Sequence, residues 1–223
     1  MSENKIGKLL YFGDPMCSWC WGIKPVLEQL DLEYPELERV TVMGGLRGGD
    51  EVPMDDGLAA MIQEAWRRIE ESTGQPFDHG LWDKHRPLAT TWPACRAVIA
   101  ARLLDKSAEW SFMVAMFQAY FTREMDPSRR ETQLQVAAEQ GLDPAQFQQL
   151  LGSDEVKEAL RKDLETTQRY GITGFPSVVL DLNGENYLIS PGYQPIDDMR
   201  RAINAAYEEA GVDFTRPESG LYS

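Results

Sequence analysis

The sequence predicts an α/β fold in which a block of helices interrupts a smaller, strand-containing core. One observation is a strand–helix–strand opening within residues 8–43. A second is a run of helical apolar periodicity over residues 55–152 that no strand-like segment interrupts. A third is a helix, a hairpin and a last helix after residue 153. With 223 residues, the chain is long enough for one elaborated domain or for a core with one sizeable insertion.

The opening elements follow from apolar runs and from the residues that stop them. Residues 8–12 form a short apolar run with two aromatic side chains, which predicts a buried strand that the Gly-Asp-Pro sequence at 13–15 ends. A helix is expected over 17–34. The alternating, β-branched residues 39–43 predict a second strand before a Gly-rich loop at 44–49. Two strands joined in this way are usually parallel, with a right-handed crossover.

The central block shows only helical signals. Apolar residues repeat at helical spacing from Leu58 until Gly74, which predicts its first helix. Asp143 can cap, and Pro144 can begin, a short helix near its end. Three more helices are expected between these two, at 93–104, 108–124 and 130–140. The block therefore predicts an all-helical insertion domain at 55–152.

The last part of the chain predicts both helices and strands. The dipeptide Asn183-Gly184 is a strong two-residue hairpin signal between two apolar runs. The expected elements are a helix from Ser153 to Gly171, strands at 177–180 and 187–189, and an amphipathic helix that Pro195 opens. Residues 1–54 and 153–223 together then form the strand-containing domain, in the order strand, helix, strand, helix, strand, strand, helix.

Composition and charge exclude several classes of protein. With 43% hydrophobic and 26% charged residues, the chain has a globular composition, and no apolar run approaches the roughly 20 residues that span a bilayer. The net charge of -14 argues against nucleic acid or an anionic membrane as a partner. The N-terminus lacks the apolar core of a secretory signal, so we expect a cytoplasmic protein, in a compartment that keeps thiols reduced.

Two cysteines lie where the first strand meets the first helix. Cys17 is expected at the helix N-terminus, where free backbone N–H groups and the helix dipole favour a negatively charged sulfur. Cys20 lies one helical turn further on and can reach the same sulfur to close an internal disulfide. Cys17 is therefore the expected nucleophile and Cys20 the expected resolving thiol.

A zinc site is the main structural alternative for a C-x-x-C pair. A structural zinc ion needs four ligands, and the sequence offers no second pair. Cys95, His79 and His85 are scattered over the helical block, and Cys95 suits the core of an Ala-rich helix. We therefore expect no metal and no bound cofactor.

Two segments together resemble a known family. The sequence from Tyr11 to Gly22, which contains the two cysteines, is similar to the active-site segment of DsbA-like thiol–disulfide oxidoreductases, in particular the FrnE-like branch. Gly174-Phe175-Pro176-Ser177 resembles the cis-proline loop of that family. The resemblance covers most of the chain, because the family also inserts a helical domain into a thioredoxin-like fold. It implies that Pro176 is a cis proline whose neighbouring backbone pairs with an extended substrate peptide.

Three further side chains are candidates for the same site. Trp19 and Phe175 lie next to the expected reactive sulfur and are predicted to bind substrate, whereas Trp21 is expected to pack in the core. Asp14 could relay a proton to or from Cys20, although an Asp before Pro is more often a turn residue.

The functional prediction is a protein disulfide oxidoreductase or isomerase acting on disulfide- or thiol-containing proteins, with glutathione as a small partner. One rival is a glutathione-dependent transferase or isomerase of the kappa type, which shares this architecture but usually lacks the second cysteine. The other is a non-catalytic peptide-binding module that uses the same aromatic surface. Neither the direction of electron flow nor the oligomeric state follows from the sequence.

Overall fold

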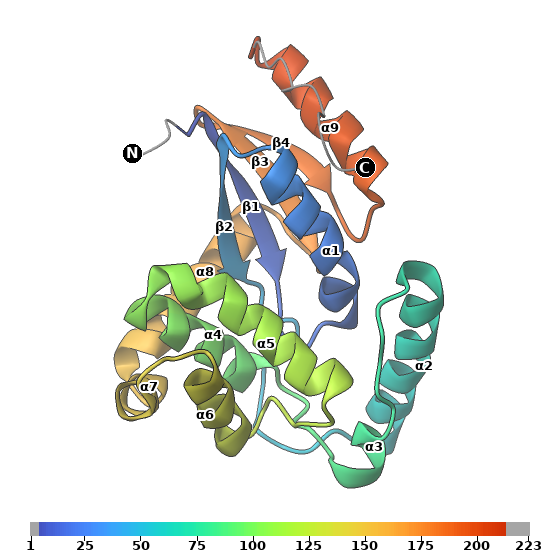
Figure 1. Cartoon of the computed structure of the whole chain (residues 1–223), viewed down its shortest axis with the longest axis vertical. Coiled ribbons are helices and arrows are strands. Elements are labelled where there is room, and N and C mark those ends of the chain that lie inside the picture. The colour runs from blue at the N-terminus through green and yellow to red at the C-terminus, as the bar shows by residue number, and fades with distance from the viewer. Residues whose placement is uncertain (1–4, 213–223) are drawn as a thin grey trace.

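A four-stranded mixed sheet forms the centre of the molecule. The computed structural model describes residues 5–212 and orders the strands β2–β1–β3–β4. The first two strands, β1 (Gly7–Gly13) and β2 (Leu37–Met43), are parallel, as the sequence predicts. β3 (Ser177–Leu182) runs antiparallel to β1, and β4 (Glu185–Ser190) runs antiparallel to β3 (Figure 1).

The first strand separates two layers of side chains. Successive strand residues point to opposite faces of a sheet. Leu9 and Tyr11 therefore join the main core, while Leu10 and Phe12 join a smaller buried cluster on the other face. Helix α1 (Ser18–Glu33) follows β1 and returns the chain to β2, so the predicted strand–helix–strand unit is confirmed, whereas its right-handed crossover stays a prediction.

Between β2 and β3 the regular elements are helices joined by loops, and the caps explain where several of the helices begin. The Asp55 side chain accepts a hydrogen bond of 2.7 Å from the backbone N–H of Leu58, and Gly74 ends the same helix with a left-handed φ of 72°. The helices are α2 (Asp56–Thr73), α3 (Leu81–Lys84), α4 (Trp92–Leu104), the 3₁₀ helix Lys106–Ala108, α5 (Glu109–Thr122), α6 (Arg130–Glu139), α7 (Pro144–Leu151) and α8 (Asp154–Arg169).

These helices agree with the sequence-based expectations except in two places, helix α3 and the 3₁₀ helix Lys106–Ala108, which lies before the helix expected from 108. Helix α3 was not predicted, because its four residues are too few to show a period. The hairpin between β3 and β4 turns at Asn183 and Gly184, both with positive φ, as the dipeptide predicts.

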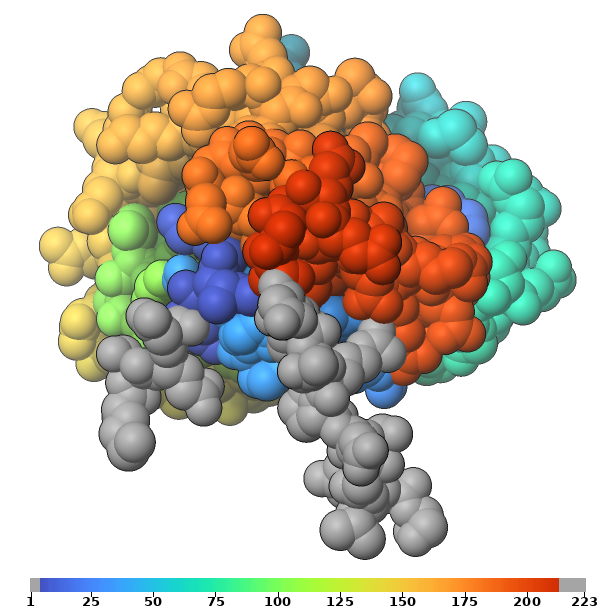
Figure 2. Space-filling view, turned by 90° about the horizontal axis from the view of Figure 1, so that it is seen from above, coloured from blue at the N-terminus to red at the C-terminus, as the bar shows by residue number. Residues whose placement is uncertain are grey.

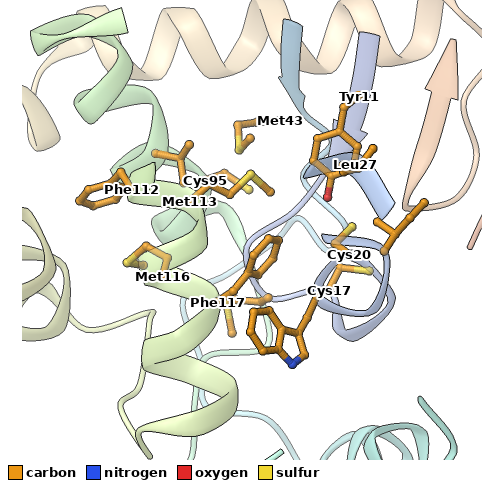
Figure 3. Close-up of a cluster of buried hydrophobic side chains, with 14 of the residues drawn as sticks. Tyr11, Cys17, Cys20, Leu27, Met43, Cys95, Phe112, Met113, Met116 and Phe117 are labelled. Atoms are coloured by element: carbon orange, nitrogen blue, oxygen red, sulfur yellow. The ribbon is translucent and has the colours of Figure 1, made fainter. Parts of the chain in front are cut away.

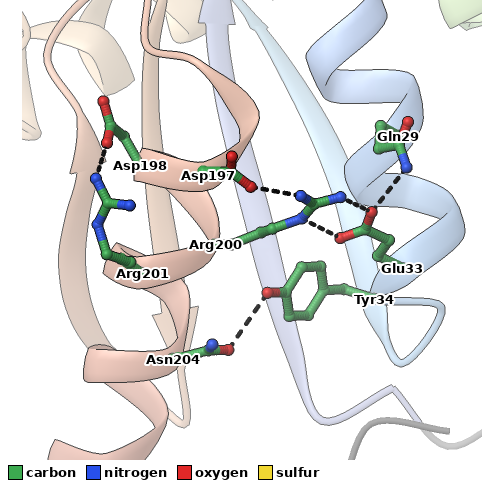
Figure 4. Close-up of polar contacts among 8 residues, drawn as sticks. All are labelled: Gln29, Glu33, Tyr34, Asp197, Asp198, Arg200, Arg201 and Asn204. Carbon is green, nitrogen blue, oxygen red and sulfur yellow. Dashed lines mark hydrogen bonds and ion pairs between the residues drawn. The ribbon is translucent and has the colours of Figure 1, made fainter. Parts of the chain in front are cut away.

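The last helix, α9 (Ile196–Glu209), packs against α1 through both apolar and polar contacts. Met199 and Ile203 are buried. The Arg200 guanidinium donates a hydrogen bond of 2.8 Å to Glu33, and the Tyr34 hydroxyl donates one of 3.3 Å to Asn204 (Figure 4). Seen from above, α9 lies in the middle of the visible surface (red in Figure 2).

One continuous core joins the sheet to the helices of the central block. All four strands lie outside residues 55–152, and helices α2–α7 lie within them. The two parts nevertheless share buried side chains, since the Trp21 ring of α1 stacks on Phe121 of α5 at 6.0 Å between centroids. The division into residues 1–54 with 153–223 and residues 55–152 therefore stays a prediction, and residues 1–4 and 213–223 lie outside the described part. No helix among the described residues is long and apolar enough to cross a membrane.

Candidate functional site

The Cys17–Cys20 pair lies where β1 ends and α1 begins. Cys17 occupies the N-cap position of α1 in an extended conformation, and its backbone N–H donates to the Asp14 carbonyl at 3.0 Å. Its own carbonyl accepts hydrogen bonds from the N–H groups of Cys20 and Trp21, at 3.0 and 3.1 Å. No side chain among the described residues caps this helix. Cys17 therefore lies at the end of α1 where the helix presents its first-turn N–H groups and the positive end of its dipole.

The proline loop predicted from the resemblance lies directly opposite this sulfur. The Phe175–Pro176 peptide bond is cis, and Pro176 is buried at the start of β3. The Cys17 thiol donates a hydrogen bond of 3.5 Å to the Phe175 carbonyl, across 158 positions of sequence. The fold thus brings together the two segments that the sequence singled out.

The two cysteines differ in their surroundings. Both residues are buried, but Cys17 keeps 4% of its surface exposed whereas Cys20 keeps none, so Cys17 lies nearer the surface of the protein. Burial raises the pKa of the Cys20 thiol well above its usual value, and the adjacent Cys17 sulfur raises it further. The Tyr11 hydroxyl and the Asp14 backbone act in the opposite direction on that pKa.

The predicted substrate-binding aromatic side chains have different positions. Trp19 is half-buried, and its ring lies 5.6 Å from that of Tyr193 in the loop between β4 and α9. The Phe175 ring fills the space above Gly44, where a Cβ would lie 2.1 Å from the ring, and it packs on the smaller buried cluster. The Phe175 carbonyl accepts the hydrogen bond of the Cys17 thiol, while its ring packs over Gly44. Substrate roles for Trp19, Phe175 and Pro176 stay predictions.

Tyr193 was not found by sequence reasoning. It lies in a loop far from both motifs, and no local pattern points to it. Only the tertiary packing of that loop against Trp19 brings the two rings together.

Asp14 is completely buried and accepts hydrogen bonds from three segments of the chain. Its carboxylate accepts hydrogen bonds of 2.8 Å from the backbone N–H groups of Met16 and Leu46. It also accepts one from the Thr91 hydroxyl and one of 3.3 Å from the Cys95 thiol. Because its oxygens are engaged in this way, the carboxylate connects the active-site loop to helix α4. A proton relay from Asp14 to Cys20 stays a prediction.

Cys95 lies in the core, fully buried near the N-terminus of α4. Burial raises the pKa of its thiol well above the usual value, and the Asp14 carboxylate raises it further through its charge and its hydrogen bond. The thiol is therefore held as a protonated donor. Among the described residues, no group of three or more His, Cys, Asp or Glu side chains is arranged to hold a metal ion.

Comparison with known proteins assigns the family. The model of the DSBA-like thioredoxin domain matches residues 8–204, which include both cysteines and the cis proline. The chain belongs to the DSBA-like thioredoxin domain family. The thioredoxin-like fold expected from the resemblance is thus confirmed, whereas the FrnE-like branch stays a prediction.

Solved structures of this family superpose over nearly the whole chain. A proposed protein disulfide isomerase from Nitrosomonas europaea is 29% identical with a TM-score of 0.81, over 91% of this chain and 98% of that one. The cytosolic disulfide reductase DsbM from Pseudomonas aeruginosa has a TM-score of 0.74 at 24% identity, over 91% and 99% of the two chains.

Curated relatives include proteins with a different role. The ClpXP adapter protein SpxH from Halalkalibacterium halodurans is 27% identical over 182 residues, covering 79% of this chain and 59% of the relative. The chain therefore matches only about three fifths of the length of that relative.

Proposed function

We propose that the protein is a thiol–disulfide oxidoreductase whose nucleophile is Cys17 and whose resolving thiol is Cys20. The observation that carries this proposal is the position of the Cys17 thiol, at the N-cap of α1 and in contact with the carbonyl before the cis proline. There the helix dipole stabilises a thiolate, and an extended peptide can pair with the backbone beside it.

The reaction has two exchange steps. The Cys17 thiolate attacks one sulfur of a substrate disulfide, forms a mixed disulfide and releases the other substrate sulfur as a thiol. Cys20 then attacks the Cys17 sulfur, which breaks the bond to the substrate and closes the Cys17–Cys20 disulfide. The substrate disulfide has gained two electrons and two protons, and the protein has lost them. The reverse sequence oxidises a dithiol.

The substrate class we propose is an extended segment of a protein, with glutathione as a small thiol partner. The half-buried Trp19 ring, two residues after Cys17, packs on the half-buried Tyr193 ring, and such rings bind apolar side chains well. The structural neighbours support this class, since one is a cytosolic disulfide reductase that was also solved with GSH. This neighbour also supports our proposal of a cytoplasmic location.

A second candidate function is that of a binding adapter that needs no redox chemistry. It is favoured by the curated relatives, which are named ClpXP adapter proteins and match more than three quarters of this chain. An adapter would use the surface around Trp19 and Tyr193 to hold another protein, and replacement of Cys17 would leave its activity intact.

The experiment that tests the first proposal is a redox titration. The protein is equilibrated with graded ratios of reduced and oxidised glutathione, denatured, alkylated and weighed by mass spectrometry, with Cys17→Ser as control. We expect one two-electron transition that joins Cys17 to Cys20 and leaves Cys95 as a free thiol. Its midpoint separates a reductase from an oxidase. Absence of the internal disulfide at every ratio would contradict the proposal, and a retained stoichiometric glutathione would favour the transferase.

A further inference from the structure

Tyr11 lies behind the cysteine pair, and neither the family motifs nor the proposed reaction assigns it a role. It is the fifth residue of β1 and is completely buried on the side of the sheet that joins the main core. Its hydroxyl has no hydrogen-bond partner of regular geometry among the described residues. An unsatisfied buried hydroxyl costs free energy, which a phenylalanine at the same place would avoid.

The surroundings of Tyr11 fix the direction of that hydroxyl. The tip of the phenol covers Gly13, where a Cβ would come within 2.4 Å of the ring and its oxygen. The edge of the Trp110 indole packs against the ring at 5.8 Å between centroids, with the planes at 86°. Figure 3 shows that the hydroxyl oxygen is directed towards the Cys20 thiol. The two groups also affect each other's pKa.

The pKa shifts of Tyr11 and Cys20 fit a contact in which the phenol donates a hydrogen bond to a sulfur that becomes negative. Burial, followed by the charge of Cys20, raises the pKa of Tyr11 well above its usual value, so the phenol keeps its proton. Its hydroxyl in turn lowers the pKa of Cys20, against the larger effect of burial. A phenol that stays protonated can only assist by donating a hydrogen bond.

We propose that Tyr11 is a catalytic residue of the second exchange step, in which its hydroxyl donates a hydrogen bond to the Cys20 sulfur. This inference rests on the proposed oxidoreductase function. In that step Cys20 loses its proton and attacks Cys17 in the mixed disulfide. The bond between Cys17 and the substrate breaks, the Cys17–Cys20 bond forms, and the departing substrate sulfur takes up one proton. Tyr11 keeps its own proton throughout.

The step needs such assistance because Cys20 is buried. A thiolate attacks disulfides far faster than a thiol, and burial makes the Cys20 thiolate costly. Attack by Cys17 on a new substrate does not use the Cys20 thiolate, so it is expected to be independent of Tyr11.

The chain offers a matched control in Tyr120. This residue of α5 is also completely buried, and its hydroxyl likewise has no partner among residues 5–212. Its ring packs edge-on against Trp66 at 5.3 Å, and the effects on its pKa come from burial and from charged groups other than the cysteines. Tyr120→Phe therefore removes a comparable hydroxyl that does not face Cys20.

The experiment follows both steps with oxidised glutathione as the substrate. Reduced protein is mixed with it, quenched by acid at increasing times and weighed by mass spectrometry, so that the mixed disulfide and the internal disulfide are counted separately. In Tyr11→Phe we expect capture within about twofold of wild type, and release of glutathione slowed by about tenfold or more. Release of glutathione from Tyr11→Phe should also need a higher pH than release from wild type.

The outcomes separate the two proposals. If Tyr11→Phe releases glutathione as fast as Tyr120→Phe does, Tyr11 only fills space and the inference is wrong. If wild type captures no glutathione, and a disulfide-bonded peptide is not captured either, the oxidoreductase proposal fails and this inference fails with it. Circular dichroism of both variants checks that each substitution, which keeps the ring, leaves the fold intact.

Discussion

The molecule holds its thiols in two contrasting environments near helix N-termini. Cys17 lies at the N-cap of α1, in contact with a backbone carbonyl and slightly exposed. Cys95 lies in the first turns of α4, fully buried, with its S–H directed to the Asp14 carboxylate. Both helices offer the same kind of dipole to a sulfur. The neighbouring groups therefore decide what each thiol can do.

A buried carboxylate beside a thiol works against ionisation. The negative charge of Asp14 and the low-dielectric surroundings both raise the pKa of Cys95, so the helix dipole cannot produce a thiolate there. The Cys17 thiol donates instead to a neutral backbone carbonyl, that of Phe175, and among the described residues no carboxylate is its hydrogen-bond partner. The same residue type is thus expected to be reactive in one place and structural in the other.

The largest expected effect comes from removing each thiol in turn. Cys17→Ser should lower the rate of disulfide exchange by at least about 1,000-fold, because serine cannot form the mixed disulfide. Cys95→Ala should keep the rate within about twofold of wild type. The reduction of a disulfide-bonded peptide, followed by chromatography, measures both. Loss of activity in Cys95→Ala, with the fold intact by circular dichroism, would break the contrast between the two thiols.

Asp14→Asn tests the group that distinguishes the two environments. The substitution keeps the size but replaces one acceptor oxygen by an NH₂ group. In one orientation this group faces the Met16 N–H, and in the other it faces the donors from Leu46, Thr91 and Cys95. We expect the free energy of unfolding to fall by about 2–4 kcal/mol, measured by urea denaturation. A change below about 0.5 kcal/mol would show that the buried cluster does not need the charge.

The sequence was most informative where its signals were local. The Gly74 helix stop, the Asn183-Gly184 hairpin and the parallel pair of strands all appear in the structure as predicted. Each depends on residues close together in the chain, where dihedral preferences and apolar periodicity act directly. Helix α3 escaped prediction because one turn has no period.

Contacts within the site were less accessible to sequence reasoning. The motifs around Cys17 and Pro176 could be identified, but the ring of Tyr193, the hydroxyl of Tyr11 and the donors to Asp14 could not. These contacts join segments that only the tertiary fold brings together. In addition, residues 8–12 already had a sufficient explanation as a buried strand, so nothing in the pattern marked the hydroxyl of Tyr11 as special.

The pH dependence of stability provides a smaller test of the Cys95 environment. The pKa of this thiol is raised in the folded protein, whereas in the unfolded chain it is about 8.5. Above that pH the unfolded state has lost a proton that the folded state keeps, so stability is fully present below about pH 8.5 and falls as pH rises. Between pH 7 and 9.5, wild type should lose about 1 kcal/mol more than Cys95→Ala. Parallel urea curves at the two pH values would show whether the two proteins instead lose stability equally.

The smallest expected effect concerns the aromatic surface, which lies beside Cys17 and has no counterpart in the fully buried surroundings of Cys95. The ring centroids of Trp19 and Tyr193 lie 5.6 Å apart, so removing either ring leaves the other without its packing partner. Trp19→Ala and Tyr193→Ala should each raise KM for a disulfide-bonded peptide by about three- to tenfold, because a partly exposed aromatic contact is worth about 0.5–1.5 kcal/mol. The double variant should lose less than the sum of the two free-energy changes, because the rings act as a pair.

Steady-state kinetics measure the effect on KM for the peptide. The control substrate is oxidised glutathione, which is too small to use the aromatic surface fully. An equal rise in KM for both substrates would mean that the rings hold the active-site helix in place and do not bind the peptide.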